Sequence, residues 1–154
     1  MIGDYVLHFP LTDFAVSLLV LAAVLDVAQR VLSRPSWRVA VDVLLVTGFI
    51  GALVSVGSGL WLLAGSDHPH DATLSLHHWF AYGALAAASA AVTARLLERR
   101  SRVFGVVRTS TLVIAAGLVS GAGFYGGKMA HGGDATMAGA PSSAGDHERT
   151  PHAH

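Results

Sequence analysis

The chain of 154 residues contains no cysteine. This absence excludes structural disulfides, iron–sulfur clusters and covalently attached c-type haem, because each of them needs a thiol. Charged residues are also scarce, at 13% of the chain against 53% hydrophobic residues. A soluble domain of this size needs more charge to cover its surface, and a formal net charge of zero gives no electrostatic basis for binding nucleic acid. The composition therefore predicts an integral membrane protein whose first partner is the lipid bilayer.

Four apolar runs are each long enough to cross a bilayer as a helix. They cover residues 9–32, 37–64, 77–97 and 103–127. The short connections favour an all-α membrane domain over residues 1–132, with four transmembrane helices in an up-down-up-down bundle. Residues 133–154 are small and polar, so we expect a flexible tail that contains histidines. No basic segment or cleavage site of a signal peptide precedes the first run, which is expected to remain in the mature protein.

Basic residues are distributed unequally between the two ends of such a bundle. Eight arginines fall in or beside the first and third connections, whereas only Lys128 and Arg149 fall at the other end. Short cytoplasmic loops carry an excess of Lys and Arg. We therefore expect the arginine-rich connections in the cytoplasm, and both termini on the periplasmic or outer side of the membrane.

Histidine is abundant, with nine residues, and none of them falls near the arginine-rich connections. Imidazoles gathered at one membrane face indicate a haem or metal site, whereas the alternative for any single one is an amphipathic side chain near the lipid headgroups. The principal candidates are attached to predicted helices: His8, His77, His78 and His131. His77 and His78 point about 100° apart on a helix, so only one of them enters the core. Two further histidines in the second connection, His68 and His70, are secondary candidates for a metal.

Charged residues within the apolar runs fall into two groups. Three acid–base pairs stand four residues apart and are expected to neutralise each other on one helix face: Asp26 with Arg30, Arg38 with Asp42, and Glu98 with Arg102. Asp13 has no basic partner at this spacing. Because an unpaired carboxylate in a membrane helix is unfavourable, we expect Asp13 to face the bundle interior and meet a histidine, a metal or water. The alternative is a carboxylate shallow enough to remain hydrated.

Small residues recur next to two of the histidines. His77 begins a stripe that continues through Ala81, Ala84, Ala88 and Ala91. A second stripe repeats every four residues and consists of Gly123, Gly127 and His131. Such stripes allow neighbouring helices to approach closely, or they leave room for a flat macrocycle. Both interpretations remain open at this point.

The order of several motifs resembles a known family. His8-Phe9-Pro10 opens the first run, Asp26 lies near its end, the second run is rich in glycine and a histidine begins the third. The fourth closes on Gly123-Phe124-Tyr125-Gly126-Gly127-Lys128-Met129-Ala130-His131-Gly132. Over roughly residues 5–133 the chain resembles the bacterial four-span membrane family catalogued as domain of unknown function 2231. The resemblance implies a four-helix protein of the bacterial inner membrane. Members of that family often occur beside haem or redox proteins. The resemblance therefore implies a haem whose candidate ligands are His8, His77 or His78, and His131.

Three functions follow as alternatives. The first is a b-type haem protein in electron transfer, with His131 and His77 or His78 as the axial pair, His8 as a third candidate and Asp13 as the orienting carboxylate. The second is a Zn, Cu or Fe site built from three imidazoles. The third is an accessory subunit of a larger membrane complex without a cofactor. A haem at this face serves only periplasmic partners, such as an electron carrier or another subunit of a redox complex. The sequence contains no catalytic triad, phosphate loop or metallohydrolase motif, which favours an electron carrier over a stand-alone enzyme.

Overall fold

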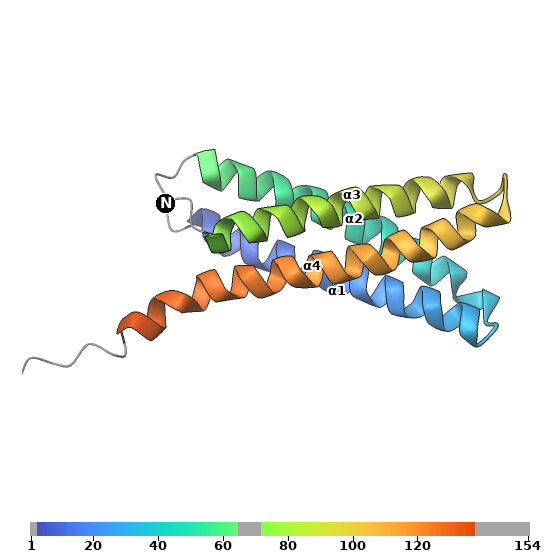
Figure 1. Ribbon diagram of the computed structural model, residues 1–154, viewed down its shortest axis with the longest axis horizontal. Helices are drawn as coiled ribbons and strands as arrows, with labels where there is room; N and C mark the ends of the chain where they lie inside the picture. The colour runs from blue at the N-terminus through green and yellow to red at the C-terminus, as the bar shows by residue number, and fades with distance from the viewer. Residues whose placement is uncertain (1–2, 65–71, 138–154) are drawn as a thin grey trace, which may run out of the picture.

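The computed structural model consists of long helices that lie side by side (Figure 1). It describes the backbone of residues 3–64 and 72–137, and the side chains of residues 8, 10–64 and 72–130. The helices are α1 (Gly3–Val31), α2 (Arg38–Ala64), α3 (Ala72–Leu97) and α4 (Arg102–Met137), with a short 3-10 helix, η1 (Pro35–Trp37), between the first two. The described residues form no strand, so the predicted all-α class is confirmed.

Each of the four helices covers one of the predicted spans to within one residue, the exceptions being Leu32 after α1 and Trp37 before α2. The four apolar segments are long enough to cross a membrane over 22 to 30 residues. The predicted ends differ where the sequence becomes polar. α1 begins at Gly3, α3 begins at Ala72 instead of residue 77, and α4 continues to Met137, beyond the predicted start of the tail at residue 133. The spans predicted from hydropathy are shorter than the helices because hydropathy identifies only the apolar segment. The backbone hydrogen bonds of the helix continue into the polar residues on either side. The rest of the predicted tail, from residue 138 onward, lies outside the described residues.

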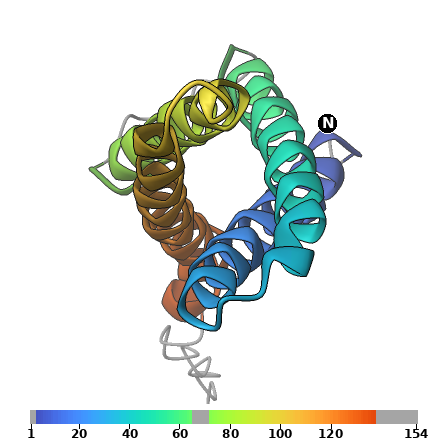
Figure 2. The same ribbon diagram turned by 90° about the vertical axis from the view of Figure 1, so that its right-hand side faces the viewer.

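Consecutive helices run in opposite directions along the long axis (Figure 1). Seen end-on, they form a ring in the order α1, α2, α3, α4, so α1 and α3 face each other across it (Figure 2). We call the end with the connections 32–37 and 98–101 the arginine end. The opposite end, which carries His8 and His77, is called the histidine end.

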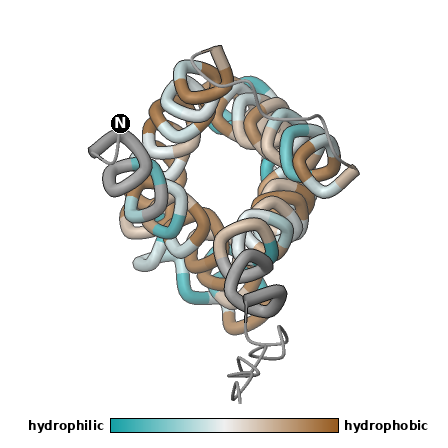
Figure 3. Tube along the Cα trace, turned by 90° about the vertical axis from the view of Figure 1, so that its left-hand side faces the viewer, coloured by the Kyte–Doolittle hydropathy of each residue, from teal (hydrophilic) through white to brown (hydrophobic). Residues whose placement is uncertain are grey.

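The outer surface of the bundle is apolar, which fits contact with a lipid bilayer. At most 28% of the residues in each span's most apolar stretch are buried inside the bundle. Large aliphatic side chains such as Val24, Ile50 and Ile114 lie exposed on three different helices. Apolar segments occur around the whole ring when the chain is coloured by hydropathy (Figure 3).

The core between the helices is built mainly from alanine. Ala22, Ala88 and Ala115 are fully buried and come from three different helices. α2 approaches α1 closely at Gly48, where a Cβ atom would lie 3.0 Å from the side chain of Leu19. Because lipid provides little hydrophobic driving force between helices, close contact through small residues is the main source of packing energy in such a bundle.

The two predicted small-residue stripes have different outcomes. On α3 the stripe below His77 packs in the core through Ala84, Ala88 and Ala91, so close packing is the correct interpretation there. On α4 the predicted stripe is only partly right: a Cβ atom at Gly123 would lie 3.7 Å from Val16 of α1, whereas Gly127 is exposed and a Cβ atom there would meet nothing within 4 Å. The most buried face of α4 runs instead through Leu112, Ala115, Val119 and Ala122. This face is one residue, or about 100°, away from the predicted one.

The turn that ends α1 contains a left-handed residue, Ser33, with a φ of 52°. The next N–H, that of Arg34, donates to the carbonyl oxygen of Gln29 over 2.8 Å, which is the closing bond of a Schellman motif. Pro35 then begins η1. This turn reverses the chain and brings the start of α2 beside the end of α1.

Candidate functional site

His77 points from α3 toward α4 at the histidine end. Its Nδ1 atom lies 2.9 Å from the carbonyl oxygen of Ala122. A carbonyl oxygen only accepts hydrogen bonds, so Nδ1 carries the hydrogen and the lone pair of the neutral ring is on Nε2. The ring lies over Gly126, where a Cβ atom would be 3.3 Å from Cε1. The glycine thus makes room for the imidazole, and the carbonyl fixes its tautomer.

His78 occupies a different face of α3. Its ring stacks on the exposed ring of Tyr82, with centroids 6.0 Å apart and an angle of 20° between the planes. The sequence left open which of the two adjacent histidines enters the bundle. The structure answers this question, because His77 bonds to α4 and continues the buried alanine stripe.

His8 on α1 is held by hydroxyl groups of α2. Its Nδ1 lies 2.8 Å from Oγ of Ser58, and that hydroxyl donates to the carbonyl oxygen of Ser55 over 2.9 Å. A serine hydroxyl has one hydrogen, so Nδ1 of His8 is the donor to Ser58 and its lone pair is also on Nε2. The ring edge lies 3.3 Å from the position of a Cβ atom at Gly59. Sequence reasoning missed these serines; the signal was the spacing of Ser55, Ser58 and Gly59 on one side of α2.

His8 and His77 are close enough to influence each other's ionisation. The pKa of His8 is lowered from its usual 6.5, first by burial and second by the charge that His77 would carry. The two residues lie on α1 and α3, which face each other across the ring (Figure 2). Two imidazoles from opposite helices, each with Nδ1 bonded to its neighbour helix, therefore lie at the histidine end within range of each other's charge.

The structure does not place any of the remaining predicted ligands beside His8 and His77 among the residues that it describes. Asp13 is exposed and bonds to none of them, so the prediction that it faces the interior is wrong, and the hydrated alternative fits its position near the histidine end. His131 lies within α4, but its side chain is outside the described part of the chain, as are His68, His70 and the three histidines of the tail. Among the side chains that the structure describes, no three metal-ligating groups come together.

Large aromatic side chains surround the bundle at the level of the two histidines. Trp61, Trp79 and Phe124 are 78%, 72% and 63% exposed, on α2, α3 and α4. Trp61 lies two residues after Gly59, which contacts the ring of His8. Trp79 lies two residues after His77, and Phe124 lies two residues before Gly126, which contacts the ring of His77. Aromatic belts of this kind mark the boundary between membrane and water. The histidine pair therefore lies at the level of exposed aromatic side chains of the kind that favour a membrane boundary.

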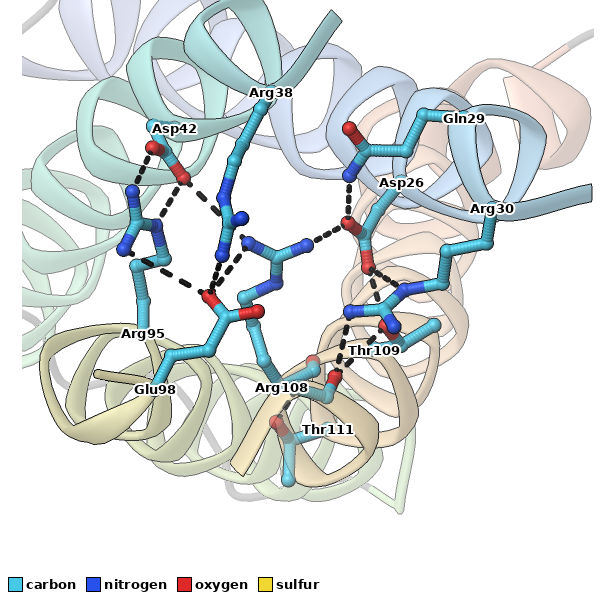
Figure 4. Close-up of polar contacts among 11 residues, drawn as sticks. Asp26, Gln29, Arg30, Arg38, Asp42, Arg95, Glu98, Arg108, Thr109 and Thr111 are labelled. Carbon is cyan, nitrogen blue, oxygen red and sulfur yellow. Dashed lines mark hydrogen bonds and ion pairs between the residues drawn. The ribbon is translucent and has the colours of Figure 1, made fainter. Parts of the chain in front are cut away.

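The arginine end contains a network of buried charges (Figure 4). At its centre Asp26 of α1 forms an ion pair with Arg108 of α4, and their side chains are 0% and 1% exposed. Asp26 also accepts hydrogen bonds from Gln29 at 2.6 Å and from the hydroxyl of Thr109 at 2.5 Å. Arg108 reaches Glu98 on its other side, at 3.3 Å. The same network includes Arg30, Arg38, Asp42 and Arg95.

These contacts correct two of the three predicted charge pairs. Asp26 and Arg30 do pair along α1, at 3.5 Å. Asp42 pairs instead with Arg95 of α3, in a bidentate contact of 2.6 and 2.5 Å. The third carboxylate, that of Glu98, pairs with Arg38 of α2 at 2.7 Å. The inward-facing carboxylates pair with arginines of neighbouring helices because four helix ends converge there. The planar guanidinium group can then bind a carboxylate across the space between two helices.

The two polar layers are separated by the same number of residues on three helices. Eighteen residues separate His8 from Asp26, His77 from Arg95, and Arg108 from Gly126. At 1.5 Å per residue this is about 27 Å, close to the thickness of the hydrocarbon core of a bilayer. Between the layers the buried side chains include Leu19, Leu45 and Leu112. An apolar part of the described core therefore lies between the two polar layers.

Comparisons of this chain with protein-family models, with curated proteins and with solved structures find no match. The resemblance to domain of unknown function 2231 thus stays a prediction from its motifs. The function has to be argued from the geometry of the two layers.

Proposed function

We propose that the chain is a membrane protein that binds b-type haem at its histidine end and transfers electrons there. The observation that carries this proposal is the hydrogen bond from Nδ1 of His77 to the carbonyl oxygen of Ala122. Histidine ligands of metals commonly donate their second ring nitrogen in this way, which fixes the tautomer and orients the ring. His8 repeats the arrangement on the opposite helix through Ser58. These two residues replace the pair expected from the sequence, with His131 as the alternative second ligand.

The residues of the histidine end fit a haem better than a single metal ion. A haem iron needs one or two axial imidazoles, whereas a zinc, copper or iron ion needs three or four protein ligands. Of the three described imidazoles, His8 and His77 bond to neighbouring helices while His78 stacks on Tyr82, and no three metal-ligating groups come together among the described side chains. Gly59 and Gly126 let the two imidazole rings pack against the neighbouring helices, which would hold both rings in fixed positions for an axial role. When bound, the haem would supply one-electron chemistry, while the chain positions the imidazoles and surrounds the group with apolar residues.

The side of the membrane follows from the arginines. Arg34, Arg99, Arg100 and Arg102 are all exposed at the arginine end, which by the positive-inside rule faces the cytoplasm. The histidine end and both termini then face the periplasm of a bacterial inner membrane. A haem there would exchange electrons with a periplasmic carrier or another subunit of a redox complex. Reporter fusions test this orientation, and a cytoplasmic C-terminus would contradict it.

The first experiment is purification in mild detergent from haem-replete cells, followed by oxidised and reduced visible spectra. We expect a Soret band, and an α band that sharpens on reduction. His77→Ala and His8→Ala should each remove the haem or its low-spin spectrum, whereas His78→Ala is the matched control and should retain both. His131→Ala separates the two candidates for the second ligand.

A colourless sample would overturn the haem proposal. Elemental analysis of the same sample would then distinguish a metal-ion site from an accessory subunit without a cofactor. Haem retained in full by His77→Ala would show that another residue is the ligand.

A further inference from the structure

The arginine end contains an open pocket that the haem proposal does not use. Its volume is about 430 Å³, and it is lined by Gln29, Arg30, Ser33, Pro35, Arg38, Glu98 and Arg108. Three of these side chains carry a positive charge and one carries a negative charge. Because the pocket lies at the opposite end from the histidines, what it binds is independent of the haem.

The charges around the pocket do not balance. The whole network joins four guanidinium groups to three carboxylates, which leaves one positive charge in excess: Arg30, Arg38, Arg95 and Arg108 against Asp26, Asp42 and Glu98. The fully buried charges, Arg108 and Asp26, neutralise each other, so the excess positive charge falls on the partly exposed guanidinium groups, where a ligand with one negative charge would balance it. Solvent reaches the pocket through the half-exposed side chains of Arg30 and Arg38.

Hydrogen-bond donors in the pocket also remain unsatisfied. Nε of Arg108 has no hydrogen-bond partner among the described residues, but it is shielded from solvent, so it is not one of the donors that a ligand in the pocket would reach. Arg38 has five N–H groups, and its ion pair with a described residue is the contact of Nη2 with Glu98. Nη2 of Arg30 donates to the carbonyl oxygen of Gly105, and its Nε forms an ion pair with Asp26. The N–H groups of the partly exposed Arg30 and Arg38 are therefore the donors that a ligand in the pocket can reach.

We propose that this pocket binds a phosphate group at the arginine end. Guanidinium groups match the tetrahedral, multiply accepting oxygens of phosphate, and three of them converge here. The pocket lies about one hydrocarbon thickness from the aromatic belt, at the depth of the opposite layer of headgroups, where basic pockets between helices bind anionic lipids. A phosphodiester headgroup carries the single negative charge that the network lacks. Free phosphate has the same chemistry and is the second source.

The test is ligand binding to the full chain in dodecyl maltoside, read as the rise in melting temperature. The probes are dioleoyl phosphatidylglycerol, dioleoyl phosphatidylcholine and inorganic phosphate, each added separately. Saturable stabilisation by phosphatidylglycerol alone assigns the pocket to a lipid headgroup. Saturable stabilisation by inorganic phosphate that phosphatidylglycerol competes away assigns it to the free anion.

Three variants connect the binding to the pocket. Arg38→Gln removes a partly exposed donor and should weaken the apparent Kd about tenfold, the effect of one charge-assisted hydrogen bond. Arg100→Gln is the matched control, because this arginine is exposed at the same end but does not line the pocket, and should change the Kd less than about twofold. Glu98→Gln raises the excess charge and should strengthen binding, which general loss of structure cannot do. Equal effects of Arg38→Gln and Arg100→Gln, or no saturable binding of any probe, would overturn the proposal.

Discussion

Removing the charge of Asp26 tests whether the buried network holds the bundle together. Asp26→Asn keeps the size of the side chain and one carbonyl acceptor, but leaves Arg108 without its fully buried partner. Removing one member of a buried ion pair destabilises a protein by about 3–5 kcal/mol. The guanidinium of Arg108 keeps two weaker contacts, at 3.3 Å with Glu98 and 3.7 Å with Asp42. We therefore expect the lower end of that range, about 3 kcal/mol.

The assay is reversible unfolding in mixed micelles, with SDS as the denaturant and helical circular dichroism as the signal. Asp13→Asn is the matched control, because Asp13 lies on the same helix, is exposed and bonds to no described residue. It should change the free energy of unfolding by less than about 0.5 kcal/mol. If Asp26→Asn is as stable as this control, the network is not an important source of stability and the argument from its burial fails.

Three smaller changes follow from the same structure and are measured in the same assay. Gly121→Ala should destabilise the bundle by about 1–3 kcal/mol, because the new Cβ would lie 2.7 Å from the ring of Phe80, which stacks on Tyr125. Gly117→Ala on the same helix meets open space and should be neutral or slightly stabilising; equal losses in both variants would show that helix packing is not the cause. Ser33→Gly should stabilise by about 0.5–1 kcal/mol, since glycine adopts the left-handed φ of 52° without a Cβ clash, and a loss of stability would contradict the turn described above. The haem-free protein should lose stability as the pH falls below 6.5, because the pKa of His8 is lowered in the folded state and the unfolded chain binds the proton first. Above pH 6.5 His8 should contribute no pH dependence, and His8→Asn should remove the loss at lower pH.

The helices and the buried face of α3 were predictable from the sequence. Span length follows from bilayer thickness, so four long apolar runs identify four helices even though polar flanks obscure their ends. The alanine stripe below His77 was read correctly, but the choice between His77 and His78 stayed open until the bond of His77 to α4 was seen. On α4 the same method was only partly right, because Gly123 faces α1 but Gly127 is exposed, and residue size did not distinguish Gly127 from the inward-facing Gly126.

The partners of the charges were not predictable in the same way. Spacing along one helix reveals a pair such as Asp26 with Arg30, but the distance between Asp42 and Arg95 depends on how two helices pack. One signal was present in the sequence. The four helix ends at the arginine end all carry charged residues within or next to an apolar span, and residues that are costly in lipid gather where they can neutralise one another.

The equal spacing of the two polar layers has a consequence for the membranes that suit this protein. A helix that slid along its neighbours by one turn would separate His77 from Ala122 and Arg95 from Asp42 at the same time. The bundle therefore cannot shorten by sliding its helices when the surrounding bilayer is thinner. It can respond only by tilting as a single body or by deforming the lipid around it, and both responses carry a free-energy cost for each ångström of mismatch. The polar contacts thus set a preferred hydrocarbon thickness of about 27 Å, given 1.5 Å for each residue between the layers.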